Sequence, residues 1–342
     1  MARDCRGQRL VNMPVLVFFS GTPMQQTSWT PDVLPGFEQT TLSGPMAFDG
    51  PADAVLVRRR CNSTGARAVL YVHGYVDYFF QTHLADFYNQ AGLHFYSLEL
   101  RRHGRAMRAH QLPNFTRAID DYLEDVDAAI HVLKTSEAVD WLLLNGHSTG
   151  GLVAVLYAHR GKNKSAVNAL FLNSPFLDMN LPPWQERFLE PLLAALGAWW
   201  PRLVVPVVTT VYGQSLHVEQ HGAWRYNTLW KPIAGFPIYA GWLHAMHRAH
   251  AEVARGLSIQ CPVLVLHARR SSWPKEWSEE AMSTDVVLDV ADIARLAPGL
   301  GPKVKLVAIK DGIHDLVLSQ PEARAQVFAE LKAWLVAIGG AQ

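Results

Sequence analysis

The sequence predicts an α/β fold with a mostly parallel sheet, and two observations support this class. Short runs rich in β-branched and aromatic residues alternate with longer segments of helical periodicity along most of the 342 residues. This alternation is typical of repeated βαβ units. In addition, 49% of the residues are hydrophobic, so the chain can bury a large core and is neither disordered nor fibrous.

Seven segments have the length and the β-branched or aromatic content of buried strands. We expect strands at 53–58, 68–72, 94–98, 141–145, 169–172, 263–267 and 304–309. Because helical patterns alternate with these segments, most of the strands should run parallel.

Helices are expected between the strands. One is predicted by apolar residues that recur every three or four positions, which places them on one helix face: Ile119, Tyr122, Val126, Ile130 and Leu133. Further helices are expected at 79–90 and from residue 152. The last begins at Pro321, a residue favoured in the first helical turn, and ends before Gly339.

The composition changes between about residues 173 and 256. Six of the eleven tryptophans lie there, prolines are frequent, and the strand–helix alternation stops until a new strand pattern begins after Cys261. We interpret 175–256 as an insertion within a single domain that spans 28–342. Residues 1–27 are expected to be an extension outside the core rather than an export leader, because Asn12 and Pro14 interrupt the apolar run at 10–19.

Charge and cysteine content exclude several kinds of function. Lys and Arg number 31 and Asp and Glu 30, so the net charge of +1 does not favour nucleic acid as a partner. Cys5, Cys61 and Cys261 are too few and too widely spaced for a disulfide framework or a Cys-x-x-Cys metal site. We therefore expect a cytoplasmic protein, or an exported one if residues 1–27 act as a leader.

Two other clusters suggest a ligand site at first sight. His244, His247 and His250 cannot all face one ion, because positions six apart on a helix point about 120° away from each other. The basic group Arg101, Arg102 and Arg105 is interpreted as part of a solvated loop rather than as a phosphate site. No metal or cofactor is expected.

The strongest chemical motif follows the predicted strand at 141–145. Residues 146–150 read Gly-His-Ser-Thr-Gly, and an apolar helical pattern begins immediately afterwards. A strand, Gly-x-Ser-x-Gly and a helix form the nucleophile elbow, in which glycines permit a sharp turn and the serine projects above the sheet. The sequence therefore predicts that Ser148 is a nucleophile.

A serine hydroxyl needs a histidine base that a carboxylate orients. His314 follows the last predicted strand, and so it should lie at the carboxyl edge of the sheet, where reacting groups gather in open α/β folds. The acid should lie between the serine and the histidine in the chain. Asp285 is the first choice, and Asp289 and Asp178 are the alternatives.

Transition-state charge also needs hydrogen-bond donors. The strand at 68–72 ends in His73-Gly74, which predicts a tight turn. We expect the backbone N–H groups of Tyr75 and of Thr149, the residue after the nucleophile, to form an oxyanion hole.

Together, His73-Gly74, Gly146-His-Ser148-Thr-Gly150, Asp285 and Gly312-Ile-His314 resemble the α/β-hydrolase family, in its branch of monoacylglycerol lipase-like, lysophospholipase and serine aminopeptidase-type enzymes. The resemblance covers roughly residues 36–338. It implies an eight-stranded, mostly parallel sheet flanked by helices, a helical lid inserted after the sixth strand, and ester hydrolysis without metal or organic cofactor.

One segment departs from the pattern of these relatives. Where they commonly have Asp-x-Arg-Gly-His-Gly-x-Ser, this chain has Glu99-Leu-Arg-Arg-His-Gly-Arg-Ala106. The departure spares the proposed triad and leaves the identity of the substrate open.

The expected function is a serine hydrolase that cleaves a small-molecule acyl ester, such as a monoacylglycerol or lysophospholipid, through an acyl-enzyme. Transient contact of the lid with a membrane surface is also expected. The alternatives are an amidase or aminopeptidase with the same triad, and a non-catalytic binding protein of this fold.

Overall fold

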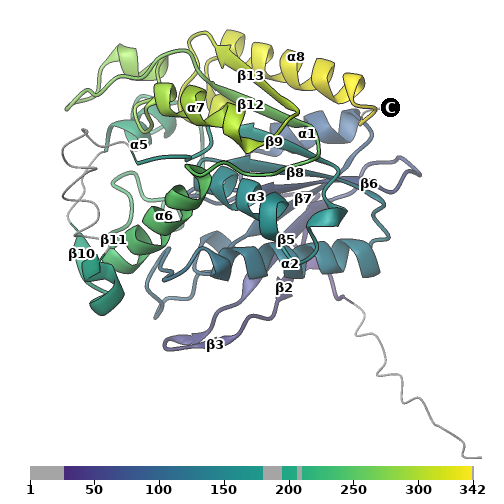
Figure 1. Ribbon diagram of the computed structural model, residues 1–342, viewed down its shortest axis with the longest axis horizontal. Coiled ribbons are helices and arrows are strands. Elements are labelled where there is room, and N and C mark those ends of the chain that lie inside the picture. The colour runs from purple at the N-terminus through teal and green to yellow at the C-terminus, as the bar shows by residue number, and fades with distance from the viewer. Residues whose placement is uncertain (1–26, 180–194, 206–209, 341–342) are drawn as a thin grey trace, which may run out of the picture.

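The computed structural model describes residues 27–179, 195–205 and 210–340 (Figure 1). The extension expected at 1–27 therefore lies outside the described residues, except for Thr27.

A nine-stranded sheet forms the centre of the molecule (Figure 1). The three strands at one edge run antiparallel to their neighbours, and the other six run parallel to one another. Their order is β1 (Thr30–Pro31), β2 (Glu38–Leu42), β5 (Ala54–Arg59), β7 (His94–Glu99), β6 (Arg67–Val72), β8 (Trp141–His147), β9 (Ala169–Asn173), β12 (Val263–Ala268) and β13 (Val304–Ile309).

All seven predicted strands are present in this sheet. The resemblance implied eight strands, and the sheet has one more because the two-residue strand β1 extends the antiparallel edge beyond β2. A separate short hairpin consists of β3 (Met46–Ala47) and β4 (Gly50–Pro51).

Helices cover both faces of the sheet. On one face lie α1 (Thr82–Gln90) and α8 (Pro321–Ala337), and on the other lie α2 (Asp120–Thr135), α3 (Thr149–Arg160) and α6 (Ala240–Val253). The helix expected from residue 79 begins at Thr82 instead, because the N–H groups of Phe79 and Phe80 are bonded to the side chains of Glu99 and Gln81.

The core is divided by the sheet into two layers, as the two-residue period of a strand requires. Leu56 and Leu70 pack against the α2–α3–α6 face, whereas Val57 and Tyr71 pack against the α1–α8 face. All four side chains are buried. The central strands are therefore sandwiched between apolar layers, which fixes the position of their carboxyl ends.

The insertion expected at 175–256 falls between β9 and β12. Its described elements are β10 (Val204–Val205), α5 (Val211–Leu216), β11 (Ile238–Tyr239) and α6, and β10 pairs with β11. α7 (Val290–Leu296) follows β12. Among the described residues, no helix combines the length and the apolar character needed to cross a bilayer.

The interpretation of three arginines as a solvated loop was wrong. Arg101, Arg102 and Arg105 are at most 8% exposed, and each forms an ion pair. Their carboxylate partners are Asp125 for Arg101, Asp49 for Arg102, and both Asp32 and Glu99 for Arg105. The segment that departs from the family pattern therefore forms buried ion pairs just after the carboxyl end of β7.

Candidate active site

Ser148 occupies a strained turn between β8 and α3. Its φ of +51° lies in the left-handed region, which residues other than glycine seldom adopt. The turn is possible because Gly146 and Gly150 lack side chains: a Cβ on Gly146 would lie 2.4 Å from the carbonyl oxygen of Gly150, and one on Gly150 would lie 2.2 Å from that of Val72. The strand, turn and helix predicted around the serine are all present.

Three side chains from distant parts of the chain form one hydrogen-bonded series. The Ser148 Oγ lies 3.0 Å from Nε2 of His314, and Nδ1 of the same imidazole lies 2.9 Å from Oδ2 of Asp285. All three residues are at most 7% exposed. A carboxylate can only accept, so Nδ1 carries the proton and Nε2 presents a lone pair to the serine hydroxyl. This tautomer is the one that a general base requires.

Asp285 is held by the backbone that surrounds it. Its Oδ1 accepts hydrogen bonds from the N–H groups of Val287 and Leu288, each at 2.8 Å. Oδ2 is thereby left facing the imidazole of His314. Because the carboxyl group is fully buried, these backbone bonds fix its direction.

The two alternative acids lie elsewhere. Asp289 is the N-cap of α7, where its side chain accepts from the N–H of Ala291 at 2.9 Å. Asp178 forms an ion pair with Arg295 at 2.7 Å. The structure therefore brings only Asp285, of the three candidates, into contact with His314.

Two rings restrict the imidazole of His314. The edge of Tyr212 packs against it with ring centroids 5.4 Å apart, and the ring of His147 lies 4.9 Å away. Both neighbours leave the imidazole little room to rotate.

The two expected oxyanion donors lie just beyond the carboxyl ends of β6 and β8. Within the described part of the chain, neither the Tyr75 nor the Thr149 amide donates a hydrogen bond to another residue. His73 fixes the peptide before Tyr75, because its Nδ1 donates to the carbonyl oxygen of Gly74 at 2.8 Å. Burial lowers the pKa of His73 to about 4, so the ring stays neutral and its Nε2 accepts the N–H of Leu100.

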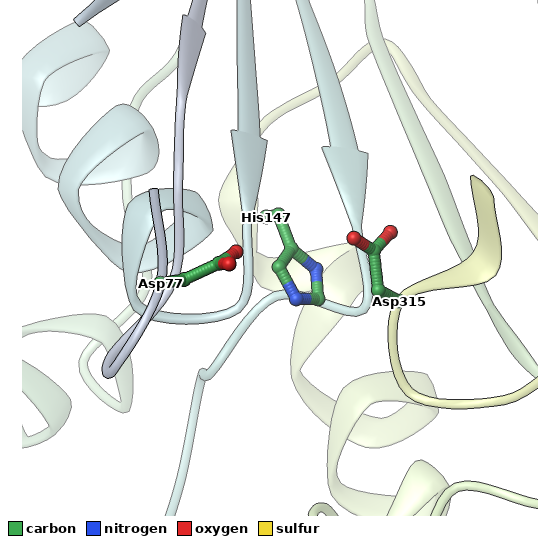
Figure 2. Close-up of side chains that lie close together, drawn as sticks. All are labelled: Asp77, His147 and Asp315. Carbon is green, nitrogen blue, oxygen red and sulfur yellow. The ribbon is translucent and has the colours of Figure 1, made fainter. Parts of the chain in front are cut away.

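Asp77, His147 and Asp315 form a second buried polar group (Figure 2), and the ring of His147 lies 4.9 Å from that of His314. Their potential ligand atoms lie within 4.8 Å of one another. However, the ammonium of Lys231 lies 2.7 Å from Asp77, and Asn173 accepts from His147 and donates to Asp315. Each of the three groups already has a protein partner, so the arrangement is a poor fit to a metal centre.

Sequence reasoning missed two residues that shape this site, Lys231 and Tyr212. Both lie in the insertion, where strand and helix patterns do not alternate, so the sequence does not predict which other residues they contact. The available signal for Lys231 was its position in a strongly aromatic segment. A lysine that is buried in such a segment needs an acidic partner, and this would have indicated a buried ion pair.

The geometry is that of an α/β-hydrolase, and comparisons with known proteins agree. Residues 64–317 match the family described as serine aminopeptidase, S33. A phospholipase of Bacillus subtilis, YtpA, is 28% identical over 280 residues, which cover 78% of this chain and 93% of the relative.

Solved structures share the fold. A soluble variant of monoglyceride lipase from Saccharomyces cerevisiae superposes with a TM-score of 0.62 at 16% identity, covering 85% of this chain and 93% of the other. Monoacylglycerol lipase from Paleococcus ferrophilus gives 0.58 at 20% identity, with 83% and 99% covered. The chain belongs to the S33 family of α/β-hydrolases and is a hydrolase.

Proposed function

We propose that the protein is a serine carboxylic-ester hydrolase that works through an acyl-enzyme. The observation that carries the proposal is the hydrogen-bonded series from Ser148 through His314 to Asp285. Ser148 attacks the ester carbonyl, and His314 takes its proton and returns it to the leaving alcohol. Asp285 holds the tautomer and stabilises the imidazolium. Water then attacks the acyl-enzyme with the same histidine as base, which frees the acid and restores Ser148.

The N–H groups of Tyr75 and Thr149 are proposed to stabilise the oxyanion. Donors of this kind act because they are oriented before the reaction and sit in a site from which water is largely excluded. Both amides are free of protein acceptors among the described residues, which supports this role.

The acyl group is proposed to be an apolar chain bound under the insertion. Trp242 of α6 packs on Tyr75 with ring centroids 4.4 Å apart and stacks on Phe176 at 6.1 Å, so an aromatic surface lies beside the oxyanion donor. The names of the similar proteins, a phospholipase and a monoglyceride lipase, describe enzymes that act on acyl lipids. These names support an acyl lipid as the substrate of this protein.

A chain-length series tests this function. Each buried methylene contributes about 0.8 kcal/mol, so kcat/KM for p-nitrophenyl esters should rise roughly fourfold per methylene until the pocket is filled. Ser148→Ala should abolish the activity on every ester. A flat profile from acetyl to decanoyl would reject the lipid substrate, whereas equal rates for wild type and Ser148→Ala would reject the serine hydrolase.

The family description favours a second candidate, an amidase or aminopeptidase with the same triad. Hydrolysis of an amino-acid arylamide should be compared with that of a monoacylglycerol under the same conditions. We expect the ester to be the better substrate by kcat/KM, and a preference for the arylamide would replace the ester proposal.

We also propose that the insertion touches a membrane surface. Trp199 and Trp200 are 81% and 63% exposed, and Leu203 and Val204 beside them are about half exposed. Interfacial tryptophans favour the headgroup region. Replacement of both by serine should reduce sedimentation with phosphatidylcholine vesicles and leave hydrolysis of a soluble ester unchanged.

A cytoplasmic location is proposed from the free thiols of Cys61 and Cys261.

A further inference from the structure

A buried ion pair joins the insertion to the loop that carries a proposed oxyanion donor. Lys231 Nζ lies 2.7 Å from Oδ1 of Asp77, although the two residues are 154 positions apart in the chain. Lys231 is 7% exposed and Asp77 is 2% exposed. The second carboxyl oxygen of Asp77 is buried and has no hydrogen-bond partner among the described residues, so Lys231 is the principal partner of this charge.

The ion pair is part of a wider contact. We call residues 73–80 the oxyanion loop. The Tyr75 hydroxyl of this loop donates to the carbonyl oxygen of Pro237 at 3.0 Å, and the Tyr78 hydroxyl accepts from the N–H of Asn227 at 2.7 Å. Three side chains of the loop therefore bind the segment 227–237, and the ion pair is the charged contact among them.

The backbone between Tyr75 and Asp77 needs such support. Val76 has a φ of +49°. A β-branched residue is strained in this left-handed region, and it stays there only where the surrounding structure holds it. Asp77 immediately follows this residue, and the Tyr75 amide immediately precedes it. His73 holds the peptide that carries the Tyr75 N–H through the Gly74 carbonyl, and a fixed Asp77 carboxylate holds the chain on the other side of Tyr75.

The electrostatics make the contact depend on Lys231. Burial is the largest influence on the pKa of Asp77 and raises it, but the charge and hydrogen bond of Lys231, together with His147 and His73, outweigh burial and hold the pKa below its ordinary value. A buried carboxylate without its cation has to take up a proton or move toward water. Either change breaks the charged contact between the loop and the insertion.

We propose that Lys231 is a positioning residue for the reaction: through Asp77 it keeps the Tyr75 amide aimed at the oxyanion, and so couples the placement of the insertion to transition-state stabilisation. The inference rests on the proposed function. It concerns a residue that does not touch the substrate and acts only through the oxyanion loop.

The test is the Lys231→Met variant, which keeps the length of the side chain and removes its charge. With p-nitrophenyl butyrate, kcat per titrated active site should fall roughly 10- to 1000-fold, while KM changes little. The upper limit is the loss of kcat expected when one oxyanion donor is removed completely. Lys305→Met is the matched control, because Lys305 forms a 2.8 Å ion pair with Glu330 on the surface. This control should keep wild-type kcat.

A second readout separates positioning from a structural role. A trifluoromethyl ketone forms an anionic adduct with the serine, and its affinity should fall by the same factor as kcat/KM. The affinity of an unreactive ether analogue should stay unchanged, because it develops no oxyanion. A purely structural role would instead lower the melting temperature and the number of titratable sites, with kcat per site intact, and this result overturns the proposal.

A double variant keeps the test decisive if Lys231→Met does not fold. Asp77→Asn combined with Lys231→Met removes both charges, so it should fold, and without the ion pair its kcat per titrated active site should still fall at least roughly 10-fold with little change in KM. A folded double variant with wild-type kcat per site overturns the proposal. A wild type that hydrolyses no acyl ester or amide overturns the proposed function as well. Wild-type hydrolysis with an unaffected Lys231→Met variant overturns this inference alone.

Discussion

At the scale of single residues, the direction of the His314 imidazole decides the chemistry of the site. Asp285 accepts from Nδ1, and this leaves the lone pair of Nε2 toward Ser148. The two rings beside the imidazole resist its rotation, but only the carboxylate selects the tautomer.

Replacement of Asp285 by Asn should therefore reduce kcat by about 10⁴-fold with little change in KM, because an amide that donates to Nδ1 favours the wrong tautomer. Steady-state hydrolysis of p-nitrophenyl butyrate measures the effect.

The control is Asp289→Ala, which removes the N-cap of α7. It should cost about 0.5–2 kcal/mol of unfolding free energy and leave kcat at the wild-type level. If the Asp289 variant lost activity while Asp285→Asn kept it, the assignment of the acid would be wrong.

At the scale of elements, the turn from β8 to α3 depends on close backbone contact. Gly150→Ala should destabilise the fold by about 1–3 kcal/mol and remove most activity, because the added Cβ would meet the carbonyl oxygens of Val72 and His73 at 2.2 and 2.4 Å.

Urea unfolding measures the loss, and Gly299→Ala is the matched control. A Cβ at Gly299 meets no atom closer than 4.0 Å, so this variant should stay within about 0.5 kcal/mol of wild type. Equal stabilities of the two variants would mean that β6 and α3 are not packed against each other in this way.

The sequence pattern predicts the central elements better than the edge. The central predicted strands, such as β7 and β9, are buried along their whole length because helices cover both of their faces, whereas β2 (Glu38–Leu42) carries the polar sequence Glu-Gln-Thr-Thr before its leucine. β1 is two residues long and contains a proline. Such edge strands are defined by their pairing partners, which local composition does not encode.

The candidate site follows the same division. Ser148 and His314 were predicted because each lies next to a recognisable strand, and the choice of Asp285 followed from chain order. Lys231 has neither signal, because its contact with Asp77 depends on how the insertion folds over the sheet. Long-range ion pairs of this kind become visible only in three dimensions.

At the scale of the whole molecule, buried neutral histidines make stability depend on pH. Burial lowers the pKa of His73 to about 4 and that of His103 to about 3. In the unfolded chain histidine has a pKa of about 6.5. Below this pH the unfolded state therefore binds protons that the folded state does not bind. Stability should therefore fall as the pH drops from about 6.5 toward 4.

The unfolding free energy measured across this range in urea tests the prediction. His103→Asn keeps a donor for the carbonyl oxygen of Arg101 and should reduce the slope between pH 5.5 and 4.5 by about 1.4 kcal/mol per pH unit, the equivalent of one proton. An unchanged slope in this variant would show that His103 titrates normally in the folded protein.

The proposed reaction depends on an activated serine at position 148, which a fluorophosphonate probe measures directly. The serine oxygen attacks phosphorus, fluoride leaves, and the hydroxyl proton passes to His314. We predict one adduct, located by mass spectrometry on the peptide that contains Ser148 and absent from both Ser148→Ala and His314→Ala. Equal labelling of wild type and Ser148→Ala, or an unlabelled wild type, would contradict the account.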